Sequence, residues 1–222
     1  MMDELLEYGV YVALLVALAI PLSAYINKVM AGEKTPLSRV LVPVENVVYK
    51  CIRVDKNEDM GWKKYLANTL VFSIFSLVGL TAILMLQGFL PFNPEGLPGQ
   101  SWHLAFNTAS SFVTNTNWQS YSGESSLSYF SQAIGLTVQN FVTPAVGMAV
   151  LFALFRGLVS EGGPGLGNFF VDATRAVLFV LIPLALVVTV VDVWQGSPQN
   201  VSEYQEVQLL EPVGIDSEGE AV

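Results

Sequence analysis

The residues best suited to bind a ligand lie between positions 101 and 124, where the sequence reads SWHLAFNTASSFVTNTNWQSYSGE. From Leu104 to Gly123 this stretch carries no charge, yet it is rich in Asn, Thr, Ser and Gln. It is too polar to face lipid and too apolar for a simple exposed loop. Leu104–Val113 could form a helix about 15 Å long, roughly half the thickness of a bilayer core.

A half-length helix followed by a polar stretch is typical of a re-entrant pore loop, because irregular backbone survives at membrane depth only where protein or water surrounds it. The short helix would direct its C-terminal carbonyls, the negative end of its dipole, into the membrane. The chain would then run back outward with exposed carbonyl oxygens through Thr114, Asn115, Thr116, Asn117 and Trp118. Such oxygens replace the hydration shell of potassium in channel filters. The alternative is a structured external loop packed on the neighbouring helices.

The composition of the whole chain argues for a membrane protein. Of its 222 residues, 52% are hydrophobic and 13% charged, against about 25% charged in an average soluble domain. The net charge of −9 argues against nucleic-acid binding, which needs a basic face. One cysteine, Cys51, excludes a disulfide framework, and one histidine, His103, argues against a zinc site or a Ser-His-Asp triad. His103 and Glu124 flank the polar stretch as a possible acid–base pair, but they lie 21 residues apart and nothing places the two in contact, so we expect no enzyme.

Four long uncharged stretches predict four transmembrane helices, since a bilayer core needs about 20 apolar residues in a helix. They are Tyr8–Asn27, Tyr65–Pro94, Ser125–Phe155 and Ala176–Val191, the last of which reaches spanning length only together with Phe169–Arg175 and Val193–Trp194. Pro21 and Pro183 fall inside predicted spans, where proline is tolerated. The acidic start of the chain argues against a signal peptide. The predicted fold class is therefore an all-α integral membrane protein with four spans and one re-entrant pore helix and loop.

The basic residues predict the orientation. Eight of the ten lie between spans one and two, and the other two, Arg156 and Arg175, flank the loop between spans three and four. Basic loops stay cytoplasmic, so we expect both termini and the 91–124 region outside. Within the first basic loop, Pro36–Val54 has helical apolar spacing interrupted by charges. It is either an amphipathic helix on the membrane surface or a helix packed under the bundle.

Polar residues inside the predicted spans leave several roles open. Asp172 and Arg175 are three residues apart on one helix and could pair. Gln132, Gln139 and Asn140 could line a pathway, or could form hydrogen bonds between helices.

A family resemblance sharpens these expectations. The run Phe106–Gly157, with its motifs TNTNWQSYSGE and GLTVQNF, closely resembles KdpA, the potassium-binding, channel-like subunit of the KdpFABC potassium-transporting ATPase. Flanking pieces at Met60–Leu66 and Leu90–Pro94 fit as well, and the resemblance extends over essentially the whole chain.

The resemblance implies a place in the superfamily of potassium transporters, which has four membrane–pore-loop–membrane repeats around one ion pathway. It implies a non-catalytic, multi-pass subunit of the cell membrane, with KdpB-, KdpC- and KdpF-like partners and no nucleic acid. Such a subunit binds external potassium and delivers it through the membrane to a P-type subunit, which hydrolyses ATP. The alternative function is a non-transporting membrane assembly subunit.

Mapped onto this chain, the resemblance implies five segments: an extra N-terminal helix (1–30), a cytoplasmic amphipathic loop (31–64), the first repeat (65–156), the opening helix of the second repeat (157–195) and an acidic external tail (196–222). It implies that the backbone carbonyls of Thr114, Asn115, Thr116 and Asn117 bind potassium, that Trp118 completes this filter strand, and that Gln119 lies just above it. The chain covers little more than one of the four repeats, so we expect a fragment, or the product of a truncated or split gene, without potassium selectivity of its own.

Overall fold

The computed structural model describes residues 2–160, 165–198 and 200–204, with side chains from residue 6 onward, and within these residues it contains helices and loops but no strand. The elements are α1 (Met2–Met30), α2 (Ser38–Ile52), α3 (Trp62–Leu86), η1 (Gln87–Phe89), α4 (Trp102–Val113), α5 (Gly123–Ser126), η2 (Ser131–Thr137), α6 (Val138–Val159), α7 (Phe169–Arg175), η3 (Ala176–Leu181) and α8 (Ile182–Trp194). The segments η2 and η3 are π-helical and run without a break into the helices that follow them. The predicted all-α fold class is confirmed.

Four helical segments in the described part of the chain are long and apolar enough to cross a membrane. They are Leu6–Met30, Trp62–Phe89, Ser131–Val159 and Phe169–Trp194. All four predicted spans are thus confirmed. The fourth does reach spanning length by joining α7, η3 and α8 into one continuous helix.

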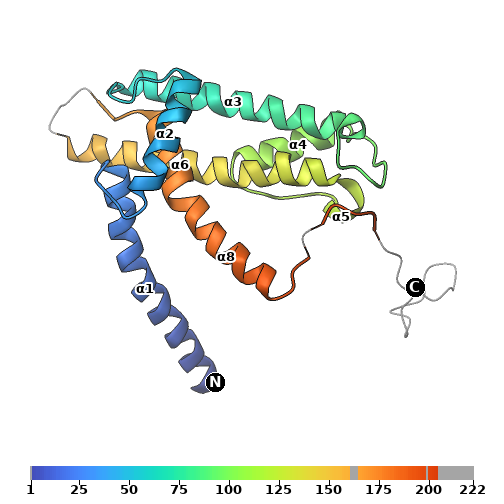
Figure 1. Ribbon diagram of the computed structural model, residues 1–222, viewed down its shortest axis with the longest axis horizontal. Helices are drawn as coiled ribbons and strands as arrows, with labels where there is room; N and C mark the ends of the chain where they lie inside the picture. Colours follow the sequence, from blue (N-terminus) through green and yellow to red (C-terminus); the bar gives the residue numbers. More distant parts are fainter. Residues whose placement is uncertain (1, 161–164, 199, 205–222) are drawn as a thin grey trace.

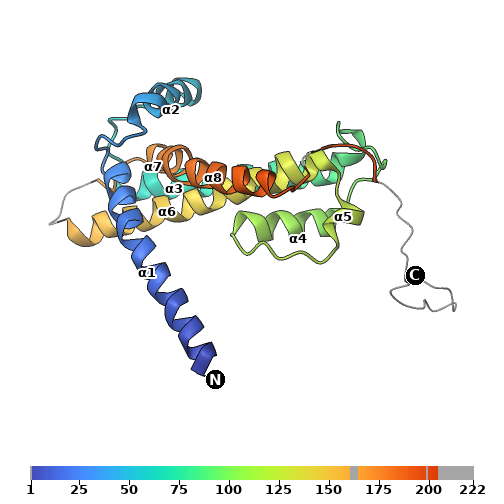
Figure 2. The same cartoon turned by 60° about the horizontal axis from the view of Figure 1, so that its bottom comes forward.

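The span α1 stands apart from the other three. It projects away from α3, α6 and α8 in both views, and its apolar length is exposed (Figures 1 and 2). Its C-terminal part is attached by the Tyr25 hydroxyl, which donates to the Phe179 carbonyl at 2.7 Å. Proline has no N–H, so Pro183 cannot bond this carbonyl four residues before it. The first span is therefore tied to a backbone carbonyl one turn before the proline of the fourth.

The amphipathic helix α2 packs against the start of the fourth span, but it does so through its polar face. Glu45 and Tyr49 are buried there, at 5% and 4% exposure, and the Tyr49 hydroxyl donates to the Glu45 carboxylate at 2.6 Å. Burial, together with this carboxylate, raises the pKa of Tyr49. The valines at positions 40 and 47 remain exposed. The sequence left two alternatives for this segment, a helix on the membrane surface or a helix packed under the bundle. The buried contacts of Glu45 and Tyr49 agree with the second.

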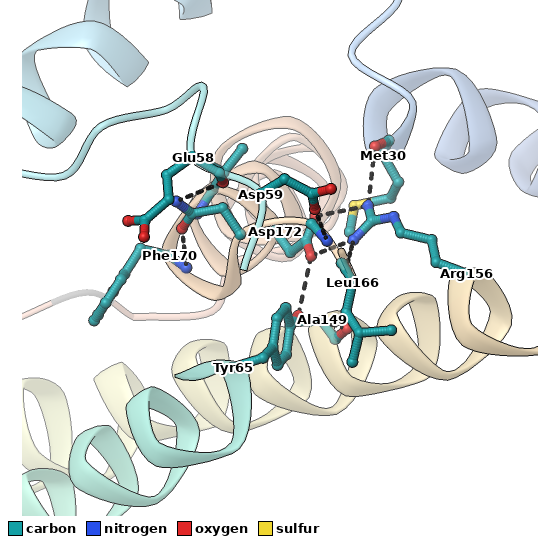
Figure 3. Close-up of polar contacts among 12 residues, drawn as sticks. Met30, Glu58, Asp59, Tyr65, Ala149, Arg156, Leu166, Phe170 and Asp172 are labelled. Atoms are coloured by element: carbon teal, nitrogen blue, oxygen red, sulfur yellow. Dashed lines mark hydrogen bonds and ion pairs between the residues drawn. The ribbon is translucent and has the colours of Figure 1, made fainter. Parts of the chain in front are cut away.

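The predicted pairing of Asp172 with Arg175 is wrong. Asp172 binds Arg156 of α6 through two hydrogen bonds, of 2.6 and 2.8 Å, and lies 3.0 Å from the Tyr65 hydroxyl of α3 (Figure 3). Arg175 instead donates from Nε to Glu45 at 2.8 Å. The two side chains share one helix but meet different neighbours, because α7 packs against α6 and α3 and also against α2.

Candidate functional site

The half-length helix α4 begins beside the end of α3 and runs back along it (Figure 1). The Gln100 N–H donates to the Leu84 carbonyl at 3.0 Å, which ties the connection to the last turns of α3. At Gly99 the backbone passes so close to the Met85 carbonyl that a Cβ atom would overlap it. The helix starts at its N-cap Ser101 and extends 12 residues, against 25 for α3. It therefore ends part-way along its neighbour.

The inner end of α4 is held in a polar contact with α6. The buried face of α4 includes Ala105, Ala109 and Phe112, which pack against α3. The Thr143 hydroxyl of α6 lies 2.8 Å from the Phe112 carbonyl and accepts from the Gln139 amide at 3.2 Å. Gln139 thus takes part in contacts at the inner end of α4.

The other two polar side chains considered in the third span, those of Gln132 and Asn140, form no hydrogen bond with α4 among the described residues. The Gln132 side chain donates to the Leu127 carbonyl at 3.1 Å, so it supports the connection before η2. Asn140 is exposed.

After α4 the amide N–H groups of residues 115–118 all turn back toward the end of the helix. The Asn115 N–H donates to the Phe112 carbonyl at 3.2 Å and so closes the last helical turn. Thr116 and Asn117 both donate to the Ser111 carbonyl, at 2.9 and 3.3 Å. Trp118 donates to the Ser111 hydroxyl at 2.7 Å. Since N–H and C=O point in opposite directions across a planar trans peptide, the carbonyls that precede these amides face away from the helix.

Two residues of this segment have a left-handed backbone conformation. Asn115 and Asn117 have left-handed φ angles of 63° and 55°, which asparagine tolerates better than most residues. Alternation of left- and right-handed residues aligns successive peptide groups, whereas in an extended strand they point in alternate directions. Within the described part of the chain, no hydrogen bond reaches the carbonyl oxygens of Thr114, Asn115, Thr116 or Asn117.

The chain then returns to the end of α3 where it began, which makes the segment a re-entrant hairpin (Figure 2). The Gln87 side chain closes it by donating to the Ser126 carbonyl at 2.8 Å and accepting from the Ser128 N–H at 3.2 Å. The segment that returns from α4, residues 114–119, is called the returning strand here although it is not a β-strand. Trp118 and Gln119 on it are exposed. Trp118 is 61% exposed, and its contact with the loop is made by its backbone N–H, which donates to the Ser111 hydroxyl.

The groups on the returning strand from Thr114 to Gln119 are electrically neutral. Glu124 lies beyond it, fully exposed, where hydrogen bonds from its own backbone and from the Ser122 hydroxyl lower its pKa. His103 stacks on Trp102 at the start of α4. Among the described residues, no group of three His, Cys, Asp or Glu could hold a metal ion. A cation at this hairpin would therefore be bound by neutral oxygens.

The structure brings together the residues predicted for the site, Thr114 to Gln119, on one exposed strand. The prediction did not include Ser111, whose backbone and side chain together receive three of the amides in that strand. No periodic pattern marks this residue, because its role depends on where the loop folds back.

Comparison with known proteins supports the resemblance noted in the sequence. Residues 9–219 match the family model of KdpA, the potassium-transporting ATPase A subunit. Relatives named potassium-transporting ATPase potassium-binding subunit include one from Clostridium botulinum strain Eklund 17B, 57% identical over 97% of this chain, and one from Desulfovibrio desulfuricans, 58% identical over 93%. The chain spans 37% and 35% of the length of these two relatives.

The match covers nearly the whole chain and includes the re-entrant hairpin and the four helices long enough to span a membrane. The protein is a multi-pass membrane protein, and it belongs to the KdpA family of potassium-transporting ATPase A subunits.

Proposed function

We propose that this chain supplies one strand of a potassium selectivity filter and takes part in ATP-driven potassium uptake. The observation that carries the proposal is the run of carbonyl oxygens from Thr114 to Asn117, which are free of hydrogen bonds from the described residues and belong to peptide groups whose N–H groups all turn back toward α4. Potassium filters are built from such oxygens, which replace the water around the ion.

The neutrality of the strand fits a transported ion, because a site for transport must hold its ion and also release it. The C-terminal end of α4 adds the negative end of a helix dipole near the ion path. One strand cannot surround an ion, so further strands must come from outside these 222 residues. The chain alone is then a partial potassium site.

The partners follow from the same proposal. The names of the relatives identify them as subunits of a potassium-transporting ATPase. We place this chain as the non-catalytic subunit that receives external potassium and passes it through the membrane to a P-type, KdpB-like subunit, which hydrolyses ATP. KdpC- and KdpF-like subunits complete the assembly.

The topology belongs to the same proposal. Residues 1–30 form an extra first span, 31–64 a cytoplasmic loop, 65–156 the first repeat and 157–195 the opening helix of the second, with both termini outside the cell membrane. The acidic external tail is assigned to 196–222, of which 199 and 205–222 lie outside the described residues. In this arrangement the hairpin mouth faces the external solution.

A charge at Gln119 tests the proposal in the assembled ATPase. Two unit charges about 4–6 Å apart interact by roughly 3–4 kcal/mol at an effective dielectric constant near 20, and about 1.4 kcal/mol is a tenfold change in affinity. Gln119→Arg should therefore raise the potassium concentration for half-maximal ATPase activity by at least about tenfold. Gln119→Glu should raise it less.

The matched control is Gln195→Arg, which adds the same charge at an exposed position beyond α8 and should leave the half-saturation concentration unchanged. An equal response to both arginine variants, or to neither, would refute a filter at this hairpin and would favour the non-transporting assembly role.

A further inference from the structure

We propose that Ser111 is the positioning residue that sets the direction of the filter carbonyls, an inference that rests on the proposed filter function. Its backbone carbonyl accepts from Thr116 and Asn117 at 2.9 and 3.3 Å, and its hydroxyl accepts from Trp118 at 2.7 Å. One residue of α4 thus receives three consecutive amides of the strand that follows. The direction of each amide determines the direction of the carbonyl in the same peptide group.

The Ser111 hydroxyl holds the last of the three peptide groups, the one that joins Asn117 to Trp118. The Trp118 N–H and the Asn117 carbonyl belong to one rigid peptide plane, and the Ser111 hydroxyl is the acceptor that holds this plane among the described residues. Asn117 has a φ of 55°, in a region that residues other than glycine rarely occupy. A conformation of this kind persists only when the surroundings hold it in place.

Loss of the hydroxyl would free that peptide plane. Without an acceptor, the plane can rotate while Asn117 relaxes to an ordinary negative φ, and its carbonyl then leaves the line formed by the preceding ones. The other two amides bond to the Ser111 backbone, which a side-chain substitution leaves in place. The effect should therefore be confined to the outer end of the strand, nearest Gln119.

Three variants in the assembled ATPase test this role. Ser111→Ala removes the acceptor, and we expect a roughly five- to tenfold higher potassium concentration for half-maximal activity, the effect of about one lost hydrogen bond. The maximal rate should change little, and the ratio of half-saturation concentrations for rubidium and potassium should move toward one. Ser111→Thr keeps the hydroxyl and should restore both values. Ser110→Ala is the matched control on the same helix, because its hydroxyl makes no hydrogen bond within the described residues.

The inference is overturned if Ser111→Ala matches Ser110→Ala in half-saturation and in ion preference while Gln119→Arg still weakens potassium affinity. It is also overturned if Ser111→Thr behaves like Ser111→Ala. If Gln119→Arg has no effect, the filter proposal itself fails. Heat stability of each purified complex separates these results from misfolding, since a purely structural role would lower stability without changing the rubidium to potassium ratio.

Discussion

Replacing Asp172 by asparagine removes one charge from a buried ion pair and leaves the other in place. The Asp172 side chain is 3% exposed and that of Arg156 30%. Breaking a buried pair by removing one partner costs about 3–5 kcal/mol, because the remaining charge stays desolvated. Arg156 keeps partial contact with solvent and a hydrogen bond to the Leu166 carbonyl at 2.9 Å. We therefore expect the lower end of this range, about 3 kcal/mol.

The assay is heat inactivation of the assembled complex in detergent, followed by size-exclusion chromatography. A loss of about 3 kcal/mol corresponds to a midpoint lower by roughly 6–12 °C for a chain of this size. The control is Glu58→Gln, which breaks an ion pair with Lys64 whose side chains are 37% and 55% exposed. Exposed pairs contribute at most about 1 kcal/mol, so this control should shift the midpoint by no more than a few degrees.

A double variant identifies the cause of the destabilisation. Adding Arg156→Met to Asp172→Asn removes the unpaired charge, so part of the lost stability should return. If Asp172→Asn lowers the midpoint no more than Glu58→Gln does, the pair is not desolvated in the assembled protein and the reasoning is refuted.

Three further predictions concern topology, autonomy and the first span. Native Cys51 should react with a membrane-impermeant maleimide only from the cytoplasmic side, and Ser197→Cys, in a Cys51→Ser background, only from outside; the reverse pattern would contradict the proposed orientation. The purified 222-residue chain should give no selective potassium flux in liposomes, and a selective current would contradict the need for further strands. Tyr25→Phe removes the donor to the Phe179 carbonyl that Pro183 cannot bond; it should destabilise the complex by about 1 kcal/mol, and an unchanged midpoint would show that water or another group takes over.

The large apolar patterns of the sequence were sufficient to predict the spans. Three of the confirmed helices are marked by 20 or more residues without charge, the length that a bilayer requires of a spanning helix. The fourth has a shorter uncharged stretch, Ala176–Val191, and reaches that length only with its flanking residues. The short helix was predicted as Leu104–Val113 and begins two residues earlier, at Trp102, because the preceding Ser101 is its N-cap. Signals of this kind are local, so they can be read from one sequence.

The polar contacts depended on tertiary geometry and were harder to predict. Spacing along α7 suggested that Asp172 would bind Arg175, but the packing of α7 gives each a partner on a different helix. The burial of Glu45 beside Tyr49 on α2 had no sequence signal. For the hairpin, the residue types indicated a carbonyl-lined strand, while its left-handed φ angles and its anchor at Ser111 required the folded backbone.

The local closure of the hairpin has a consequence for how the protein is made. The amide of Trp118 finds its acceptor only seven residues back along the chain, and the other amides of the loop reach the same end of α4. Contacts between residues close in sequence form early, before distant segments need to meet, and chains begin to fold from the N-terminal side during synthesis. This loop can therefore pair its amides while the ribosome is still producing later segments. In the proposed filter, a loop of this kind would enter assembly already folded, and the ion path would form when several such loops come together.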